Sequence, residues 1–180
     1  MLNTFVVYVE DKPGVLARVA VLIRRRVFNI ETLTVGRSEA PGVSRMTIVV
    51  ESNEQEARRI EANLYKLVNV LWVQNVTQSC VSRDLSLVKV GVAANAREEL
   101  AELGRKHGAR ILDEDGETLM FEIIGNEDQI DRFLASLDPY RVIEMVRTGR
   151  IAMTRCGQAE NPVRSVMQQG KGDTEGLCCR

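Results

Sequence analysis

The chain has 180 residues, of which 44% are apolar, and 24 Lys and Arg residues nearly balance 25 Asp and Glu residues. This composition allows one domain or two small ones, and the formal net charge of −1 excludes the basic footprint of a typical nucleic-acid-binding domain. No apolar run approaches the roughly 20 residues that span a bilayer, and residues 1–5 do not resemble a secretory signal. The spacing of the cysteines matches neither a disulfide framework nor a zinc site, so we expect reduced thiols in a cytoplasmic protein without membrane partners; the cysteines are Cys80, Cys156, Cys178 and Cys179.

The first half of the chain alternates between strand and helix signals. Residues 5–9 form a short apolar run typical of a buried strand, and apolar residues at helical spacing predict a helix over 16–27. Strands are predicted over 30–35 and 46–50. Asn53 and Glu56 have the spacing of a capping box, which predicts a helix to about Leu67, and a strand over 68–76 closes the unit.

The second half repeats this order. A strand is predicted over 85–92, and Asn95 with Glu98 indicates a helix start. The pair Asp115-Gly116 between residues 109–112 and 119–124 predicts a hairpin. Asn126 and Gln129 indicate a second capping box, and a last strand is predicted over 142–146. Nothing after residue 154 is periodic, so we expect a flexible tail over 156–180.

The pattern predicts an α+β fold with two tandem ferredoxin-like βαββαβ modules, over residues 2–78 and 82–155. Helices cover only one face of the sheet in such a module, yet residues 6–9 and 70–73 are apolar on both faces. We therefore expect the other face to be covered by the other module, by a second copy of the chain and by a different protein.

One segment between a strand and a helix has the chemistry of an anion site. It contains Asp11, Lys12, Pro13, Gly14, Val15 and Leu16. Pro13 suits a helix start, and Gly14 lacks a Cβ, so a ligand can approach the backbone closely. The N–H groups of residues 14–16 are expected to point outward unpaired at the positive end of the helix dipole, where they bind a carboxylate. A plain strand-to-helix turn explains the same residues equally well.

Asn29, which follows the predicted helix, is a second candidate. Its amide can contact the polar end of a ligand, and a helix C-cap is the alternative. The single histidine, His107, lies in a helix-ending turn and is expected to be a surface residue. No nucleophile–base pair, phosphate loop or metal-ligand cluster is apparent, so neither catalysis nor a bound metal is predicted.

Several strings, taken in order, resemble one family. Residues 10–19 (EDKPGVLARV) are similar to the opening of an ACT domain, a small-molecule sensor of amino-acid metabolism. Residues 28–36 (FNIETLTVG), 44–48 (SRMTI) and 64–70 (LYKLVNV) resemble the regulatory small subunit of acetolactate synthase (acetohydroxyacid synthase). Residues 83–90 (RDLSLVKV) and 147–150 (RTGR) resemble the C-terminal domain of that family.

The resemblance implies an N-terminal ACT domain, a second ferredoxin-like domain and no catalysis by this chain. It implies a large catalytic subunit as partner, which carries thiamine diphosphate, Mg²⁺ and usually FAD, and feedback by a branched-chain amino acid, usually valine. It also implies a homodimer through the ACT domain, with the effector bound by the loop from Asp11 to Leu16 and by Asn29 across the dimer. Leu16 and Ile30 are expected to line the pocket for the effector side chain.

One departure concerns charge, because some family members have Asn where this chain has Asp11. An ionised Asp11 repels a carboxylate and can instead attract the ammonium group of the effector. Two other interpretations remain. One is a stand-alone ACT-domain sensor that acts on another metabolic or transcriptional target, and the other is an enzyme in its own right.

Overall fold

The computed structural model describes residues 1–25, 28–157 and 163, which form two compact units. The first unit comprises Met1–Val81 and the segment from Ala152 onward, and the second comprises Ser82–Ile151. Residues 152–155, which the sequence pattern predicts to belong to the second module, are grouped by their contacts with the first unit.

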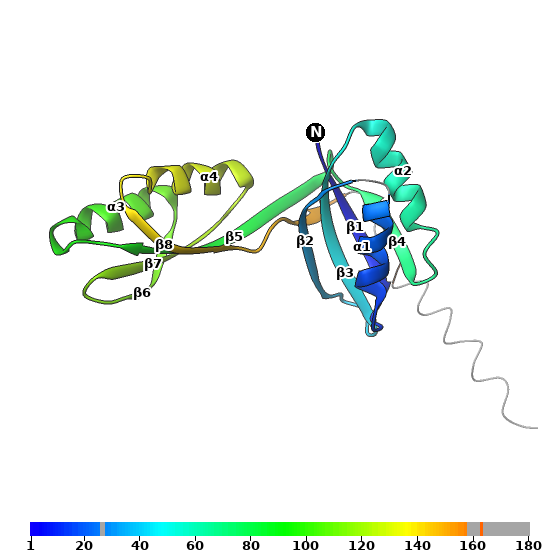
Figure 1. The fold of residues 1–180 in the computed structure, drawn as a ribbon, viewed down its shortest axis with the longest axis horizontal. Coiled ribbons are helices and arrows are strands. Elements are labelled where there is room, and N and C mark those ends of the chain that lie inside the picture. The colour runs from blue at the N-terminus through cyan, green and yellow to red at the C-terminus, as the bar shows by residue number, and fades with distance from the viewer. Residues whose placement is uncertain (26–27, 158–162, 164–180) are drawn as a thin grey trace, which may run out of the picture. The chain divides into compact units, whose positions relative to one another are not determined.

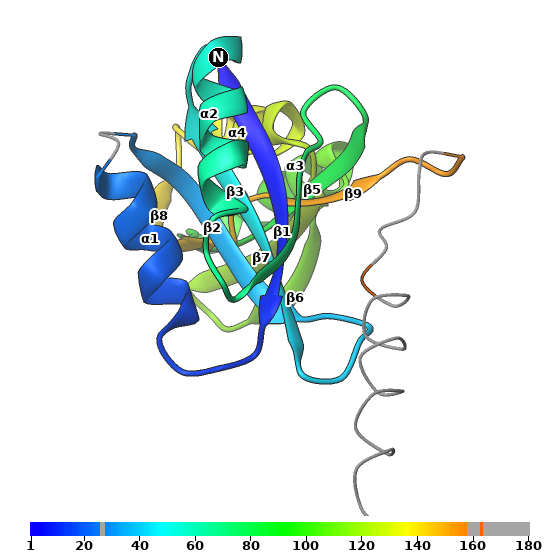
Figure 2. The same ribbon diagram turned by 90° about the vertical axis from the view of Figure 1, so that its right-hand side faces the viewer.

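The first unit is a four-stranded antiparallel sheet with two helices on one side (Figures 1 and 2). The strand order is β2-β3-β1-β4, as expected for a ferredoxin-like module. The elements are β1 (Leu2–Glu10), α1 (Val15–Arg25), β2 (Ile30–Arg37), β3 (Val43–Glu51), α2 (Glu54–Leu64) and β4 (Val70–Asn75).

The central strand β1 is buried on both faces. Phe5, Val7 and Val9 belong to the core cluster that also contains Val19 and Ile23 of α1. The alternate residues of β1 belong to a second cluster, which consists of Val6, Tyr8, Ala40, Val43, Val76, Ala152 and Val163. The chain therefore supplies part of the cover for the second face of this sheet from its own C-terminal segment.

The second unit repeats the plan, with α3 and α4 on one side of its sheet (Figure 1). The strand order is β6-β7-β5-β8, and β9 pairs with β5. The elements are β5 (Cys80–Gly91), the 3₁₀ turn η1 (Ala94–Ala96), α3 (Arg97–His107), β6 (Arg110–Glu114), β7 (Thr118–Gly125), α4 (Glu127–Ser136), β8 (Arg141–Arg147) and β9 (Ile151–Thr154). The predicted α+β class with two ferredoxin-like modules is confirmed.

Local signals explain most of the helix and hairpin boundaries. Both capping boxes are present, with Asn53 and Asn126 each accepting from the backbone three residues on. The predicted hairpin joins β6 to β7, and N–H donors from Glu117 and Thr118 lower the pKa of Asp115. The prediction of a helix start at Asn95 is wrong: residues 94–96 form the 3₁₀ turn, and the N-cap of α3 is Ala96, which makes no side-chain cap bond.

The C-terminal region differs from the expectation in one described part. β9 was not predicted, because four residues after Gly149 are too few for a periodic signal. Most of the predicted tail over 156–180, including Cys178 and Cys179, lies outside the described residues. Val163 within it is 1% exposed.

Candidate functional site

The loop between β1 and α1 reverses the chain within four residues. The Asp11 N–H donates to the Gly42 carbonyl at 2.8 Å, and the Lys12 N–H donates to the Glu10 carbonyl at 2.9 Å. Gly14 then adopts a φ of 81°, in the left-handed region that favours glycine. These bonds turn the chain directly into the first residue of α1.

Two of the three backbone donors expected at this helix start are available. The N–H groups of Gly14 and Leu16 have no hydrogen-bond partner within the described residues, and both residues are exposed. The Val15 N–H differs from the expectation, since it donates to the Lys12 carbonyl at a long 3.4 Å. Two such donors at the positive end of an 11-residue helix can bind a carboxylate.

The carboxylate of Asp11 lies in the same loop and is also exposed. Its Oδ1 accepts a hydrogen bond from the Ser44 hydroxyl at 3.1 Å, which ties the loop to the start of β3. A negative group beside two backbone donors complements a small zwitterion, because the donors take the carboxylate and the aspartate takes the ammonium.

A polar cluster supports the base of the loop. The Glu10 carboxylate accepts hydrogen bonds from the side-chain amide of Asn69 and from Lys12 Nζ at 3.1 Å. These two donors, Asn69 first, hold the pKa of Glu10 below its ordinary value of 4.5. The Asn69 side chain also accepts from the Arg18 guanidinium.

Ser44, Asn69 and Arg18 are not among the site residues predicted from the sequence. All three lie in the strings that carry the family resemblance (SRMTI, LYKLVNV and EDKPGVLARV), which is the signal that could have drawn attention to them.

Asn29 and Ile30 lie beyond the other end of α1. An 11-residue helix is about 16 Å long, so the loop and Asn29 are not brought together within one chain. Asn29 is exposed and makes no side-chain hydrogen bond within the described residues. Ile30 packs partly against the core, whereas Leu16 is 42% exposed. A pocket that contains both ends of α1 requires a second chain.

Other candidate groups have ordinary structural roles. His107 is half-buried and its ring lies 5.7 Å from that of Phe133. Within the described residues no cluster of His, Cys, Asp and Glu has metal-ligand geometry. Cys80 is half-buried and Cys156 is exposed.

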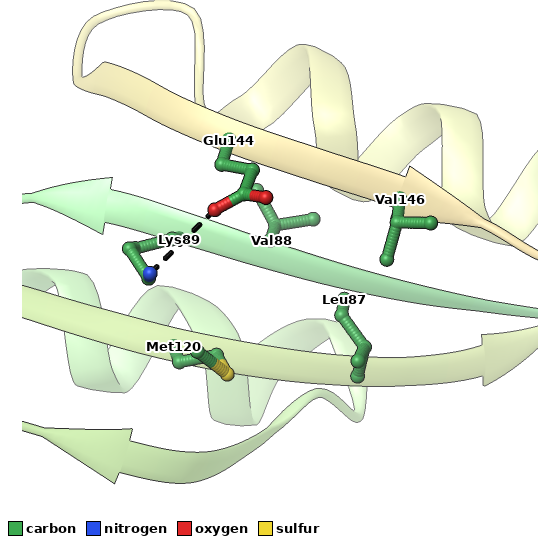
Figure 3. Close-up of a pocket in the computed structure, with 6 residues that line it drawn as sticks. All are labelled: Leu87, Val88, Lys89, Met120, Glu144 and Val146. Atoms are coloured by element: carbon green, nitrogen blue, oxygen red, sulfur yellow. Dashed lines mark ion pairs between the residues drawn. The ribbon is translucent and has the colours of Figure 1, made fainter.

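The second sheet presents a shallow cavity of about 120 Å³ on the face opposite its helices (Figure 3). Side chains of Leu87, Met120 and Val146 surround the Lys89–Glu144 ion pair, in which Lys89 Nζ lies 3.6 Å from Glu144 Oε2. The lining of this cavity is mostly apolar, whereas the loop of the first unit offers backbone donors and a carboxylate, so the loop is the stronger candidate.

Both units are similar to known protein families. Residues 5–72 match the model of an acetohydroxyacid synthase small subunit-like ACT domain, and residues 83–156 match that of the small subunit of acetolactate synthase. The probable acetolactate synthase small subunit of Archaeoglobus fulgidus is 43% identical over 155 residues, covering 86% of this chain and 98% of that protein. The acetolactate synthase small subunit of Mycobacterium leprae is 40% identical over 163 residues, which cover 90% of this chain and 96% of that protein.

A solved structure extends the similarity to the whole fold. The crystal structure of the acetolactate synthase small subunit from Thermotoga maritima matches with a TM-score of 0.82 and 34% identity, over 88% of this chain and 99% of that one. Among the described residues, no helix is long and apolar enough to cross a membrane.

Proposed function

Because the chain belongs to the family of acetolactate synthase small subunits, the non-catalytic regulatory subunits of that enzyme, we propose that it makes the enzyme sensitive to feedback by valine. In this proposal the chain binds the large catalytic subunit, raises its activity, and lowers that activity again when a branched-chain amino acid binds the ACT domain. The family carries no cofactor, and thiamine diphosphate, Mg²⁺ and FAD are assigned to the large subunit.

The observation that carries the proposal is the pair of N–H groups without a partner among the described residues, on the exposed residues Gly14 and Leu16, in the same loop as the exposed Asp11 carboxylate. The effector carboxylate binds the two donors, and its ammonium group binds Asp11. The branched side chain packs against Leu16, which is otherwise 42% exposed. An amino acid supplies all three groups within one small molecule.

A second copy of the chain supplies the residues at the far end of α1 to the effector pocket. Asn29 and Ile30 are too distant to complete the pocket in their own chain, so the proposed homodimer brings them to the loop of the partner subunit. Because each site then contacts two chains, effector binding changes how the chains associate. A coupling of about 1–3 kcal/mol suffices for strong feedback.

Reconstitution with the cognate large subunit tests the proposal. Acetolactate formation is measured with and without the chain, and with valine, leucine or isoleucine added separately. We expect the chain to raise activity and valine to reverse the increase, while the isolated chain forms no acetolactate. Calorimetry of valine binding to the isolated chain reports the site directly.

Two outcomes would contradict the proposal. Acetolactate formation by the isolated chain would make it an enzyme. If the chain fails to bind or activate the large subunit and instead recovers a different protein in a pull-down from the native cell extract, that result would favour a stand-alone amino-acid sensor.

A further inference from the structure

Asn69 occupies a turn where three elements of the first unit meet. It directly precedes β4, and its carbonyl accepts from the Glu10 N–H at 2.9 Å, at the end of β1. The pairing of β1 with β4 shifts register between Tyr8 and Val9, next to this contact. Such bulges re-aim side chains, and here the bulge accompanies the placement of the Asn69 side chain beside the effector loop.

The Asn69 side chain bonds to one group that needs a hydrogen-bond donor and to another that needs an acceptor. Its Nδ2 donates to the Glu10 carboxylate, and its Oδ1 accepts from the guanidinium of Arg18, which lies one turn into α1. A carboxamide supplies a donor and an acceptor at once, whereas alanine supplies neither.

Four side chains form a continuous series of contacts at the base of the loop. Lys12 Nζ lies 3.1 Å from the Glu10 carboxylate, so Lys12, Glu10, Asn69 and Arg18 are connected in sequence. Lys12 precedes Gly14 and Arg18 follows Leu16, so the connected residues bracket both exposed donors. Through these contacts the Asn69 side chain links the residues that flank the two donors in the sequence.

We infer that Asn69 is a positioning residue that holds the Gly14 and Leu16 N–H groups in the geometry that binds the effector carboxylate. The inference rests on the proposed function and extends it to a residue outside the loop. A loop that is already ordered loses less conformational freedom when the ligand binds, so its affinity is higher.

The test replaces Asn69 with alanine in the full chain, reconstituted with the large subunit. We expect the valine concentration for half-inhibition to rise about 3- to 10-fold, the scale of one or two lost hydrogen bonds at a partly exposed site. Activation without valine is measured in the same variant, because it reports whether the contact with the large subunit is intact. Asn95→Ala is the matched control, since Asn95 is exposed in the second unit and makes no side-chain hydrogen bond within the described residues.

A double variant identifies the contact that matters. If Asn69 acts through Glu10, then Glu10→Ala combined with Asn69→Ala should shift the valine response no further than Asn69→Ala alone. Strictly additive effects would mean that the two residues act independently, and would overturn the inference.

Two readouts do not require valine. In Asn69→Ala, the pKa of Glu10 measured by NMR should rise toward 4.5, because its first hydrogen-bond donor is lost. The ¹⁵N order parameter of Gly14 should fall. An unchanged order parameter with an unchanged valine response would show that Asn69 does not position the loop.

These readouts separate the inference from the proposed function. A wild-type chain that ignores valine would refute the proposed function, while the Gly14 order parameter would still decide whether Asn69 orders the loop. Equal losses of activation and valine response, with a lowered Tm, would assign Asn69 a general structural role and overturn the inference.

Discussion

At the scale of single residues, two features favour glycine at position 14: the approach of a ligand to the backbone, and the backbone conformation itself. The absence of a Cβ suggested close approach by a ligand, and a Cβ built there would meet nothing within 4 Å. The φ of 81° adds a second reason, because the left-handed region costs most residues about 1–2 kcal/mol. Substitutions at Gly14 must therefore separate backbone strain from effects on the ligand.

Gly14→Asn and Gly14→Asp form a matched pair, since both side chains tolerate the left-handed region and differ mainly in charge. We expect similar decreases in Tm for the two variants. Both variants should raise the valine concentration for half-inhibition, because each adds a side chain where the ligand approaches the backbone. Gly14→Asp should raise it about tenfold more than Gly14→Asn, because its carboxylate repels that of the effector. Equal valine responses in the two variants would contradict an anion site at this loop.

At the scale of elements, a buried ion pair joins the two strings that suggested the C-terminal domain. Arg147 of β8 lies 2.8 Å from Asp84 of β5 and 2.8 Å from Asp131 of α4. The Asp84 side chain is only 6% exposed, so its charge depends on Arg147. The Thr148 N–H also donates to the Leu85 carbonyl at 3.0 Å. The strings RDLSLVKV and RTGR therefore meet at one end of the β5–β8 strand pair.

Arg147→Leu is expected to destabilise the second unit by about 2–4 kcal/mol, because it leaves the Asp84 carboxylate buried without its partner. Amide hydrogen exchange at Val88, in the same strand as Asp84, measures the loss. Arg105→Leu is the control, since its pair with Glu102 is exposed and contributes about 0–1 kcal/mol. Adding Asp84→Asn should recover part of the stability; no recovery would mean that Arg147 acts by packing instead.

At the scale of the whole molecule, the first unit is completed by residues from the other end of the chain. Ala152 and Val163 are buried in the cluster that contains Val6 and Tyr8 of β1. The Arg45 guanidinium donates to the Ala152 carbonyl and lies 5.7 Å from the centre of the Tyr8 ring. The C-terminal segment thus supplies part of the cover that the apolar pattern of β1 required.

Val163→Asp should open this cover, because a carboxylate would replace a side chain that is 1% exposed. We expect a loss of about 2–3 kcal/mol in the first unit. The only tryptophan, Trp72, packs against this cluster, so its fluorescence reports the change during urea unfolding. Cys156→Asp, at an exposed position of the same segment, is the control, and equal midpoints for both variants would contradict the role of Val163.

The sequence by itself determined the features that depend on neighbours a few residues apart. Helical periodicity, the capping boxes at Asn53 and Asn126, and the hairpin at Asp115 all arise within one or two turns of chain, and each is present. The candidate loop was also predictable from the sequence, because Pro13 favours a helix start and Gly14 permits a sharp turn in the adjacent backbone. The prediction at Asn95 was wrong because this residue lies inside a 3₁₀ turn, where its side chain does not cap the following helix.

Only the tertiary structure decided which distant residues meet. Asn69 reaches Glu10 across 59 positions and Arg147 reaches Asp84 across 63, and neither contact has a local sequence pattern. The β1–β4 bulge and the pairing of β5 with β8 create these contacts, because register brings particular side chains together only after the sheets have formed. The packing of Ala152 and Val163 against the first sheet was also decided by the tertiary structure. An apolar face can be buried by any apolar segment, and only the completed fold determines which segment lies against it.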